Sequence, residues 1–400
     1  MKRSSVSSAV TQAVLLFLAN GLLLGSWATA IPGLARRLDL GEGRLAVVLL
    51  GLATGGIAMM IAAPRLIGRV GHRPLSRISG VLSAFAFILP LTAPSWLTAI
   101  GATLFMGAVM GCMDIAMNTE AVVVEQRRGR PILSRLHGCF SIGALAGSLF
   151  GGLLIEAGVG QLGHGLATAL LAGLVVVPTC IVRPDTVIDP VATQERPHGN
   201  NLRDALAALT LLAFIAFAGL VCEGAMIDWT VKLMRQYGEA PLAAAAVYGA
   251  FAGGMAVGRL SGDSFTLRIG DRVLLVAGCL IAAGGVGVMI LSVRAAIALP
   301  AMLLAGLGVA NIVPVVFRLA GAHGSNPASS LAFVTICAYC GLLVGPVAIG
   351  SIAEWTGLRL ALFFVVAALL SAALAGRLRS VLTHGSASGN QQFVPVESTL

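Results

Sequence analysis

Long apolar stretches separated by short polar joints fill the chain from Lys2 to Arg379. Positions 4–35 carry no charged residue, and neither do positions 78–113, where Pro90, Pro94 and Ser95 predict a tight turn between two spans. A helix needs about 20 apolar residues to cross a bilayer. The pattern predicts an all-α membrane protein with twelve transmembrane helices, at 11–33, 45–66, 76–93, 96–119, 134–155, 162–182, 205–231, 242–262, 273–293, 295–317, 328–352 and 358–376.

The longest polar joint divides the twelve spans into six and six. It runs from Arg183 to Asp204 and contains three prolines and a Gly-Asn-Asn turn signal. Two packed bundles of this kind are the geometry in which transporters rock about a central site. We therefore expect an N-terminal six-helix bundle over 1–182, a cytoplasmic linker over 183–204, a C-terminal six-helix bundle over 205–382, and a disordered tail over 383–400.

Basic residues are distributed unevenly between the two sides that this topology predicts. The side of the termini holds 19 of the 26 Lys and Arg, and the other side holds seven. Because cytoplasmic joints are enriched in these residues, both termini are expected in the cytoplasm, with the chain in a bacterial-type inner membrane. The formal net charge of +9 then mainly reflects the orientation in the membrane and does not indicate nucleic-acid binding. The expected surroundings are lipid, and the expected state is a monomer.

Two joints repeat a Gly- and Arg-bearing pattern at equivalent places in the two halves, over 64–73 and 258–272. The pattern resembles the signature of the major facilitator superfamily, G-x-x-x-D-R-x-G-R-R, although Gly68 stands at the usual position of the acid and His72 replaces an arginine. In that family these charges form a latch that holds the cytoplasmic side shut. The resemblance covers all twelve spans and implies the same fold, with a latch formed by Arg69, Arg73, Arg259, Asp263 and Arg268.

Short segments in three spans narrow the resemblance. The segment 114–119 of span four is similar to the acid-T-x-x-N-P segment of fucose-permease-like sugar:proton symporters, with Thr119 in place of the proline. Segments 223–229 of span seven and 308–314 of span ten are also similar to that branch. Span one departs from it, since Asn20 stands where an acid is usual. The resemblance implies proton-coupled movement of a small solute.

Two carboxylates inside apolar spans are the leading candidates for carrying protons. A charge near the middle of a span costs about 2.5–3.5 kcal/mol on insertion scales, so Asp114 and Glu223 need a partner or a function. Asp114 shares a helix face with Asn118. A structural reading stays open for both acids: Asp114 is either a proton carrier or a capping charge paired with Arg135 or His137, and Glu223 is either a carrier or one member of a structural pair.

Other polar and aromatic residues are candidates for the lining of a substrate cavity, each with a packing alternative. His137 either relays protons or bonds a neighbouring helix, and the aromatic residues, Tyr248 included, either stack on a substrate or pack between helices. Asp228 and Lys232 are spaced for a simple surface pair. Gly143, Gly147 and Gly151 predict a close helix contact. The proposed cavity residues are Asn20, Trp27, Asn118, His137, Asn311 and Tyr339.

Cys337 and Cys340 form a CxxC, but on a helix in lipid small apolar filler is a better reading than a redox or metal role, and we assign no motif to catalysis, a cofactor or a metal. The sequence has no Walker P-loop and no H-E-x-x-H spacing among its six His, and the seven Cys all lie in or beside apolar segments. An ion gradient is the expected energy source. We predict a secondary active transporter that moves a small polar or amphipathic solute with protons by alternating access. The alternatives are a proton-antiport exporter of drugs or metabolites and, from another class, a non-transporting membrane sensor or assembly factor.

Overall fold

A computed structural model describes residues 2–128, 130–181, 202–322 and 327–378, and all regular structure in these ranges is helical. The helices, in chain order, are α1 (Lys2–Arg37), α2 (Glu42–Val70), α3 (His72–Ala86), α4 (Ile88–Thr92), α5 (Trp96–Arg128), α6 (Leu133–Glu156), α7 (Gln161–Ile181), α8 (Leu202–Gln236), α9 (Pro241–Ser292), α10 (Ala295–Val309), α11 (Ile312–Ala322), α12 (Pro327–Thr356), α13 (Leu358–Ala361) and α14 (Phe363–Ala375).

Twelve helical segments in the described ranges are long and apolar enough to cross a membrane, which confirms the predicted spans. Three of them combine two consecutive helices, namely α3 with α4, α10 with α11, and α13 with α14. The long helix α9 holds two spans, Pro241–Gly262 and Arg268–Ser292. Its backbone leaves helical geometry at Gly270, where φ is 77°. The predicted turn after Pro90 is also present, between α4 and α5.

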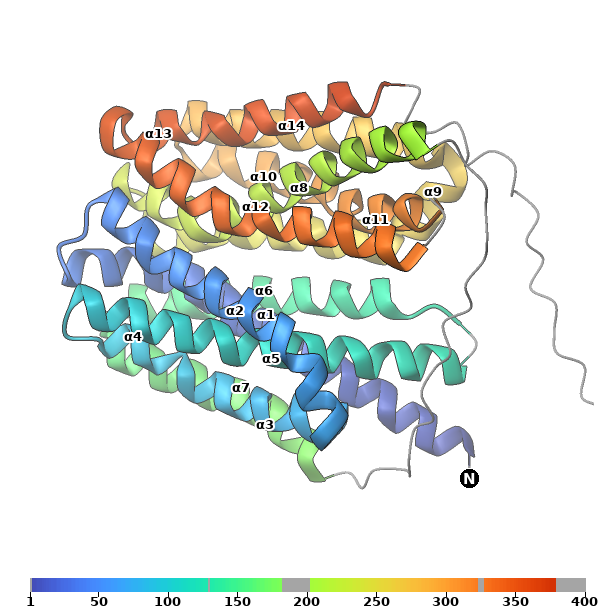
Figure 1. The fold of residues 1–400 in the computed structure, drawn as a ribbon. Coiled ribbons are helices and arrows are strands. Elements are labelled where there is room, and N and C mark those ends of the chain that lie inside the picture. The colour runs from blue at the N-terminus through green and yellow to red at the C-terminus, as the bar shows by residue number, and fades with distance from the viewer. Residues whose placement is uncertain (1, 129, 182–201, 323–326, 379–400) are drawn as a thin grey trace, which may run out of the picture.

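The helices form two groups that face each other across the molecule, α1–α7 on one side and α8–α14 on the other (Figure 1). The turns repeat between the groups. Positive φ angles occur at Asp39 and Gly238, at Gly71 and Gly270, and at Gly158 and Gly357, and the members of each pair are 199 residues apart. A backbone that repeats its left-handed turns at one spacing is expected of two related halves. The proposed linker lies largely outside the described residues, and the domain boundaries stay a prediction.

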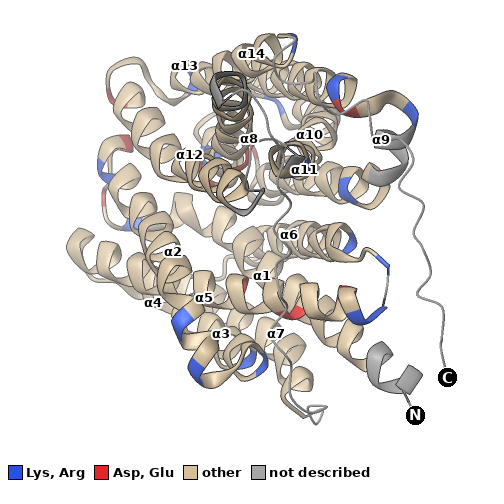
Figure 2. Cartoon of the chain, turned by 45° about the vertical axis from the view of Figure 1, so that its right-hand side comes forward, with Lys and Arg blue, Asp and Glu red and all other residues tan. Residues whose placement is uncertain are grey.

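The outer surface of the helices is apolar, as lipid contact requires. Large side chains such as Leu97, Leu170 and Ile181 are more than 60% exposed. Lys and Arg lie mainly toward the helix ends (Figure 2). We call the end of the molecule that holds residues 2 and 378 the terminal end. The end with the joints at 38–41, 93–95 and 237–240 is called the opposite end (Figure 1).

Glycine seams join pairs of helices within each half. A Cβ at Gly143 or Gly147 of α6 would overlap the backbone of α1 at Leu18 or Leu22, and Gly25 of α1 meets the backbone of α6 in the same way. The predicted close contact along span five is therefore confirmed. Similar contacts join α2 to α5, α9 to α10 and α8 to α12. Because backbone meets backbone, these helix pairs tolerate almost no side-chain volume at the seam.

Replacing Gly147 with Leu should prevent correct packing of α1 against α6. A new side chain would meet the carbonyl and Cα of Leu22, which cannot yield as a flexible side chain can. The expected loss of stability exceeds the about 1–3 kcal/mol of ordinary overpacking. Fluorescence-detected size exclusion and thermal unfolding in detergent would measure it. Gly101→Leu is the matched control, since nothing lies within 4 Å of a Cβ there, and equal behaviour of the two variants would contradict the seam.

Candidate functional site

A buried ion pair links α8 and α9 near the middle of the molecule and also reaches the other half. The Arg259 guanidinium of α9 lies 3.3 and 3.2 Å from the two carboxylate oxygens of Glu223 on α8. It also donates to the hydroxyl of Ser141 on α6, at 2.9 Å. The side chains of Arg259 and Glu223 are 11% and 16% exposed. Arg259, predicted as part of the latch, thus stabilises the charge of Glu223.

Asp114 brings a second carboxylate into this region. It lies on α5, is half-buried, and accepts a hydrogen bond from the amide of Asn118 at 3.2 Å; the same amide donates to the Asp114 backbone carbonyl at 2.8 Å. The predicted pairing on one helix face is therefore present. Asp114 interacts electrostatically with Glu223 across the two halves, and Tyr339 of α12 lies within electrostatic range of both acids. The proposed partners Arg135 and His137 do not bind Asp114.

His137 and Tyr248 complete the set of polar groups around Arg259. The His137 ring packs edge-on against Phe17 of α1, with 5.1 Å between the ring centroids, and lies within electrostatic range of Arg259. Tyr248 of α9 is buried and lies within range of Glu223 and Arg259. We call Asp114, Asn118, His137, Ser141, Glu223, Tyr248, Arg259 and Tyr339 the central cluster. Its charged groups are the carboxylates of Asp114 and Glu223 and the guanidinium of Arg259. When both acids are ionised, the cluster therefore has one more negative charge than positive charges.

Three other residues expected to line a cavity are nearly covered by protein. Trp27 is 0% exposed and Asn20 is 3% exposed, both on α1. The indole nitrogen of Trp27 and the amide oxygen of Asn20 have no hydrogen-bond partner among the residues that the structure describes. Asn311 is also buried, and its amide donates to the Gly258 carbonyl at 3.0 Å, so it joins the end of α10 to α9. In this conformation the three side chains are buried and lie outside the central cluster, and their role in lining a cavity stays a prediction.

The latch residues at the terminal end have different partners in the two halves. Arg73 lies 3.5 Å from Glu120 of α5, and both side chains are mostly buried. At nearly equivalent positions of the second half, the signs are reversed, since Arg318 pairs with Asp271. Arg69 and Arg268 are exposed. The side chain of Asp263 lies outside the described residues.

Sequence reasoning missed Glu120 because it placed the end of span four at position 119. The helix α5 continues to Arg128, so this acid lies within the helix and is 1% exposed. Ser76 of α3 donates to it at 3.2 Å. An acid followed by four further apolar or small residues is the signal that would have extended the span. Ser141 carried no such signal, since its role depends on Arg259 from the other half.

Contacts between the halves close the opposite end of the molecule. Lys232 of α8 lies 3.1 Å from Glu42 at the start of α2, and Gln236 donates to the same carboxylate at 2.7 Å. Glu156 at the end of α6 accepts from the Leu242 backbone N–H at the start of α9, at 3.1 Å. An acid at a helix N-terminus is stabilising. We call Glu42, Glu156, Lys232, Gln236 and Leu242 the outer gate.

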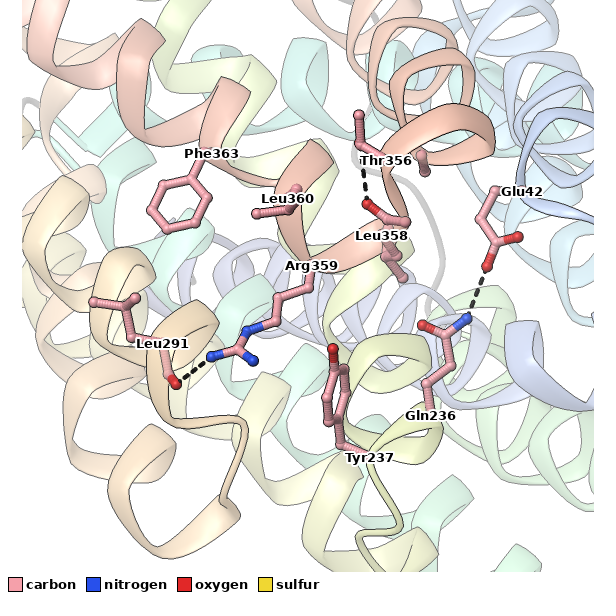
Figure 3. Close-up of a pocket in the computed structure, with 11 residues that line it drawn as sticks. Glu42, Gln236, Tyr237, Leu291, Thr356, Leu358, Arg359, Leu360 and Phe363 are labelled. Atoms are coloured by element: carbon pink, nitrogen blue, oxygen red, sulfur yellow. Dashed lines mark hydrogen bonds between the residues drawn. The ribbon is translucent and has the colours of Figure 1, made fainter.

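A pocket of about 670 Å³ adjoins the outer gate (Figure 3). Its polar groups are already engaged: Arg359 donates to the Ile290 and Leu291 carbonyls at 2.8 and 2.6 Å and lies over the Tyr237 ring. Gln236 binds Glu42 at its edge. Because these groups hold α13 against the ends of α8 and α9, we assign the pocket no substrate role and take the central cluster as the candidate site.

The arrangement of two six-span groups around a central polar cluster agrees with comparisons to known proteins. The family model of the Major Facilitator Superfamily matches residues 13–330. The chain belongs to this superfamily. It is a multi-pass membrane transporter of the superfamily's kind, similar over nearly its whole length to bacterial relatives. Membrane protein MosC of Rhizobium meliloti is 32% identical over 362 residues, covering 90% of this chain and 87% of that protein.

Further members of the superfamily show similar lengths and folds. An uncharacterised MFS-type transporter of Yersinia pestis is 30% identical over 381 residues, covering 94% of this chain and 97% of that protein. The crystal structure of the nucleoside transporter NupG superposes with a TM-score of 0.68 at 15% identity, covering 92% of this chain and 98% of NupG. The crystal structure of an inward-facing bacterial homologue of the human lysosomal transporter Spinster superposes with a TM-score of 0.62, covering 92% of this chain and 96% of that protein. These structures support the fold.

Proposed function

We propose that this superfamily member is a secondary active transporter that couples the movement of a small polar or amphipathic solute to protons by alternating access. The observation that carries the proposal is the charge of the central cluster. Glu223 is paired with Arg259, whereas among the described residues Asp114 has only the neutral Asn118 as its side-chain hydrogen-bond partner. Carboxylates within transmembrane spans are the groups that carry protons in many transporters.

The central cluster contains residues from both halves, which supports alternating access. Its residues come from α5 and α6 of the first half and from α8, α9 and α12 of the second. Arg259 binds an acid of its own half and a hydroxyl of the other. A proton or solute that changes this pairing would change the attraction between the halves. The similarity of segments 114–119 and 223–229 to fucose-permease-like sugar:proton symporters supports the same coupling, and sugars are therefore the first substrates to test.

A ligand screen followed by a proton assay tests this function. Purified protein would be screened for thermal stabilisation by sugars, amino acids and common drugs at two pH values, because a ligand bound by the native state raises its stability. Each hit would then be added to proteoliposomes containing a pH-sensitive dye. We expect solute addition to move protons across the membrane. Solute uptake that neither moves protons nor responds to an imposed pH gradient would contradict the coupling.

The proposed orientation places both termini in the cytoplasm of a bacterial cell with the protein in its inner membrane. The asymmetry of 19 against seven basic residues supports it. Reporter fusions after Gln126 and Val191 should score cytoplasmic, whereas fusions after Leu40 and Gly238 should score periplasmic. A reversed result at any of these four positions would overturn the orientation.

A further inference from the structure

Asp228 of α8 is a buried carboxylate that the central cluster does not include. It is 8% exposed and forms no hydrogen bond or ion pair with any described residue. A buried carboxylate without a cation is costly in its ionised form, and it is commonly neutralised by a proton. The predicted surface pair between Asp228 and Lys232 is wrong for this conformation, because both residues are buried and Lys232 binds Glu42 of the other half.

Lys232 nevertheless lies one helical turn from Asp228, on the same face of α8. Residues at this spacing are close enough for an ion pair. The present partner of Lys232, Glu42, belongs to α2 and must move away with the first half when the opposite end opens. Lys232 is 8% exposed in this conformation, and after that movement its ammonium group is free to bind another acid. Asp228, on the same helix as Lys232, is the acid that can become its new partner.

We propose that Asp228 is a proton-binding site and that Lys232 exchanges between Glu42 and Asp228 as the outer gate closes and opens. With the gate closed, Lys232 binds Glu42 and Asp228 holds a proton. When the gate opens, Asp228 releases that proton and binds Lys232, and Glu42 faces water. One proton is bound at each closure and released at each opening. This inference rests on the proposed proton-coupled transport, and it adds a gate-linked site separate from Asp114.

The groups around Asp228 leave Lys232 as its available cation. Tyr248 of α9 lies within electrostatic range of it, and Glu223 precedes it by five residues on α8. Of the elements packed on α8, helices α10 and α14 contain no charged residue, nor does α1 over positions 4–35. Three cations on these elements have other partners: Arg259 binds Glu223, Arg318 binds Asp271, and Arg235 binds the Glu239 carbonyl.

Distance measurements between spin labels at the opposite end test the exchange. Gly160→Cys and Leu360→Cys would carry the labels on the full chain, with the seven native cysteines replaced, because both positions are exposed and lie in different halves. The ratio of closed to open gate should rise as pH falls from about 9 to about 5, by up to about tenfold per unit, which is the limit for one proton. Asp228→Asn should hold the gate closed and remove this response.

Two further variants distinguish the exchange from a general loss of structure. Glu42→Gln should shift the ratio toward the open gate at every pH while keeping a pH response, because Asp228 can still bind Lys232. Asp39→Asn is the control, an exposed acid of the same end, and should behave as the parent protein. A pH response that is absent from the parent or unchanged in Asp228→Asn would overturn the proposal, as would a Glu42→Gln distribution equal to that of the parent. None of these results depends on the Asp114 transport assay, so the two proposals fail separately.

Discussion

Asp114→Asn is expected to abolish proton-driven accumulation of the solute while leaving solute binding and exchange intact. The amide keeps the size of the side chain and its hydrogen bond with Asn118 but cannot bind a proton reversibly. With one proton per solute, the parent protein can accumulate solute by up to about tenfold per unit of pH gradient. In proteoliposomes that contain the variant, the internal solute should reach only the external concentration. Proteoliposomes with an imposed pH gradient, and a ligand found by the thermal screen, would measure the loss.

Counterflow, the exchange of internal for external solute, shows whether this variant still binds and moves the solute. Exchange of internal for external solute needs no net proton movement, so Asp114→Asn should retain it at a rate near that of the parent. Asp39→Asn, which changes an exposed acid outside the central cluster, should retain both accumulation and exchange. Accumulation by Asp114→Asn with the pH dependence of the parent would make Asp114 a structural acid, and the coupling role would pass to Glu223.

Arg259→Gln should destabilise the protein and stop transport. Without the guanidinium, Glu223 stays within the bundle without its ion-pair partner, and Ser141 loses the donor from the other half. Breaking one side of a buried ion pair typically costs about 3–5 kcal/mol, and the partial exposure of both side chains places this case toward the lower value. Thermal unfolding in detergent, compared with proteoliposome uptake, would show both effects.

The double variant Arg259→Gln/Glu223→Gln separates charge from packing. If the loss in Arg259→Gln comes from an uncompensated carboxylate, neutralising Glu223 as well should restore most of the stability but not the transport. Such recovery is a coupling between the two sites that single variants cannot show. Equal stability of the single and double variants would mean that Arg259 contributes mainly through packing or through Ser141.

The twelve spans could be predicted because apolar length is a local property of the sequence. The predicted ends of the spans differ from the observed ones: α5 continues through Glu120 to Arg128, and α8 continues to Gln236 past the predicted end at 231. Asp114 and Glu223 could be singled out separately, since each is an acid within an apolar run. Their electrostatic contact across the halves depends on how the two groups of helices pack, which no local pattern contains.

The partners of the basic residues were the least predictable part of the site. The repeated turn motif assigned Arg259 to a latch, yet the helix is intact at this position and directs the guanidinium to Glu223. Lys232 has an acid one turn away in sequence and instead binds Glu42, which is 190 residues earlier in the chain. Sequence spacing indicates which pairs are possible within one helix, whereas the conformation of the whole transporter decides which pair forms.

The glycine seams restrict motion within each half, so movement during transport is expected between the halves. Where backbone packs on backbone, any relative sliding of α1 and α6 would open voids along the whole seam, so these helices move together. The polar bonds between the halves instead involve side chains, at Glu42, Ser134, Ser148, Glu156 and Arg259. The barrier to alternation is then expected to depend on these exchangeable bonds together with the packing of α6 on α9 and of α2 on α12. Substitutions at the bonds should change the turnover rate without altering the packing within each half.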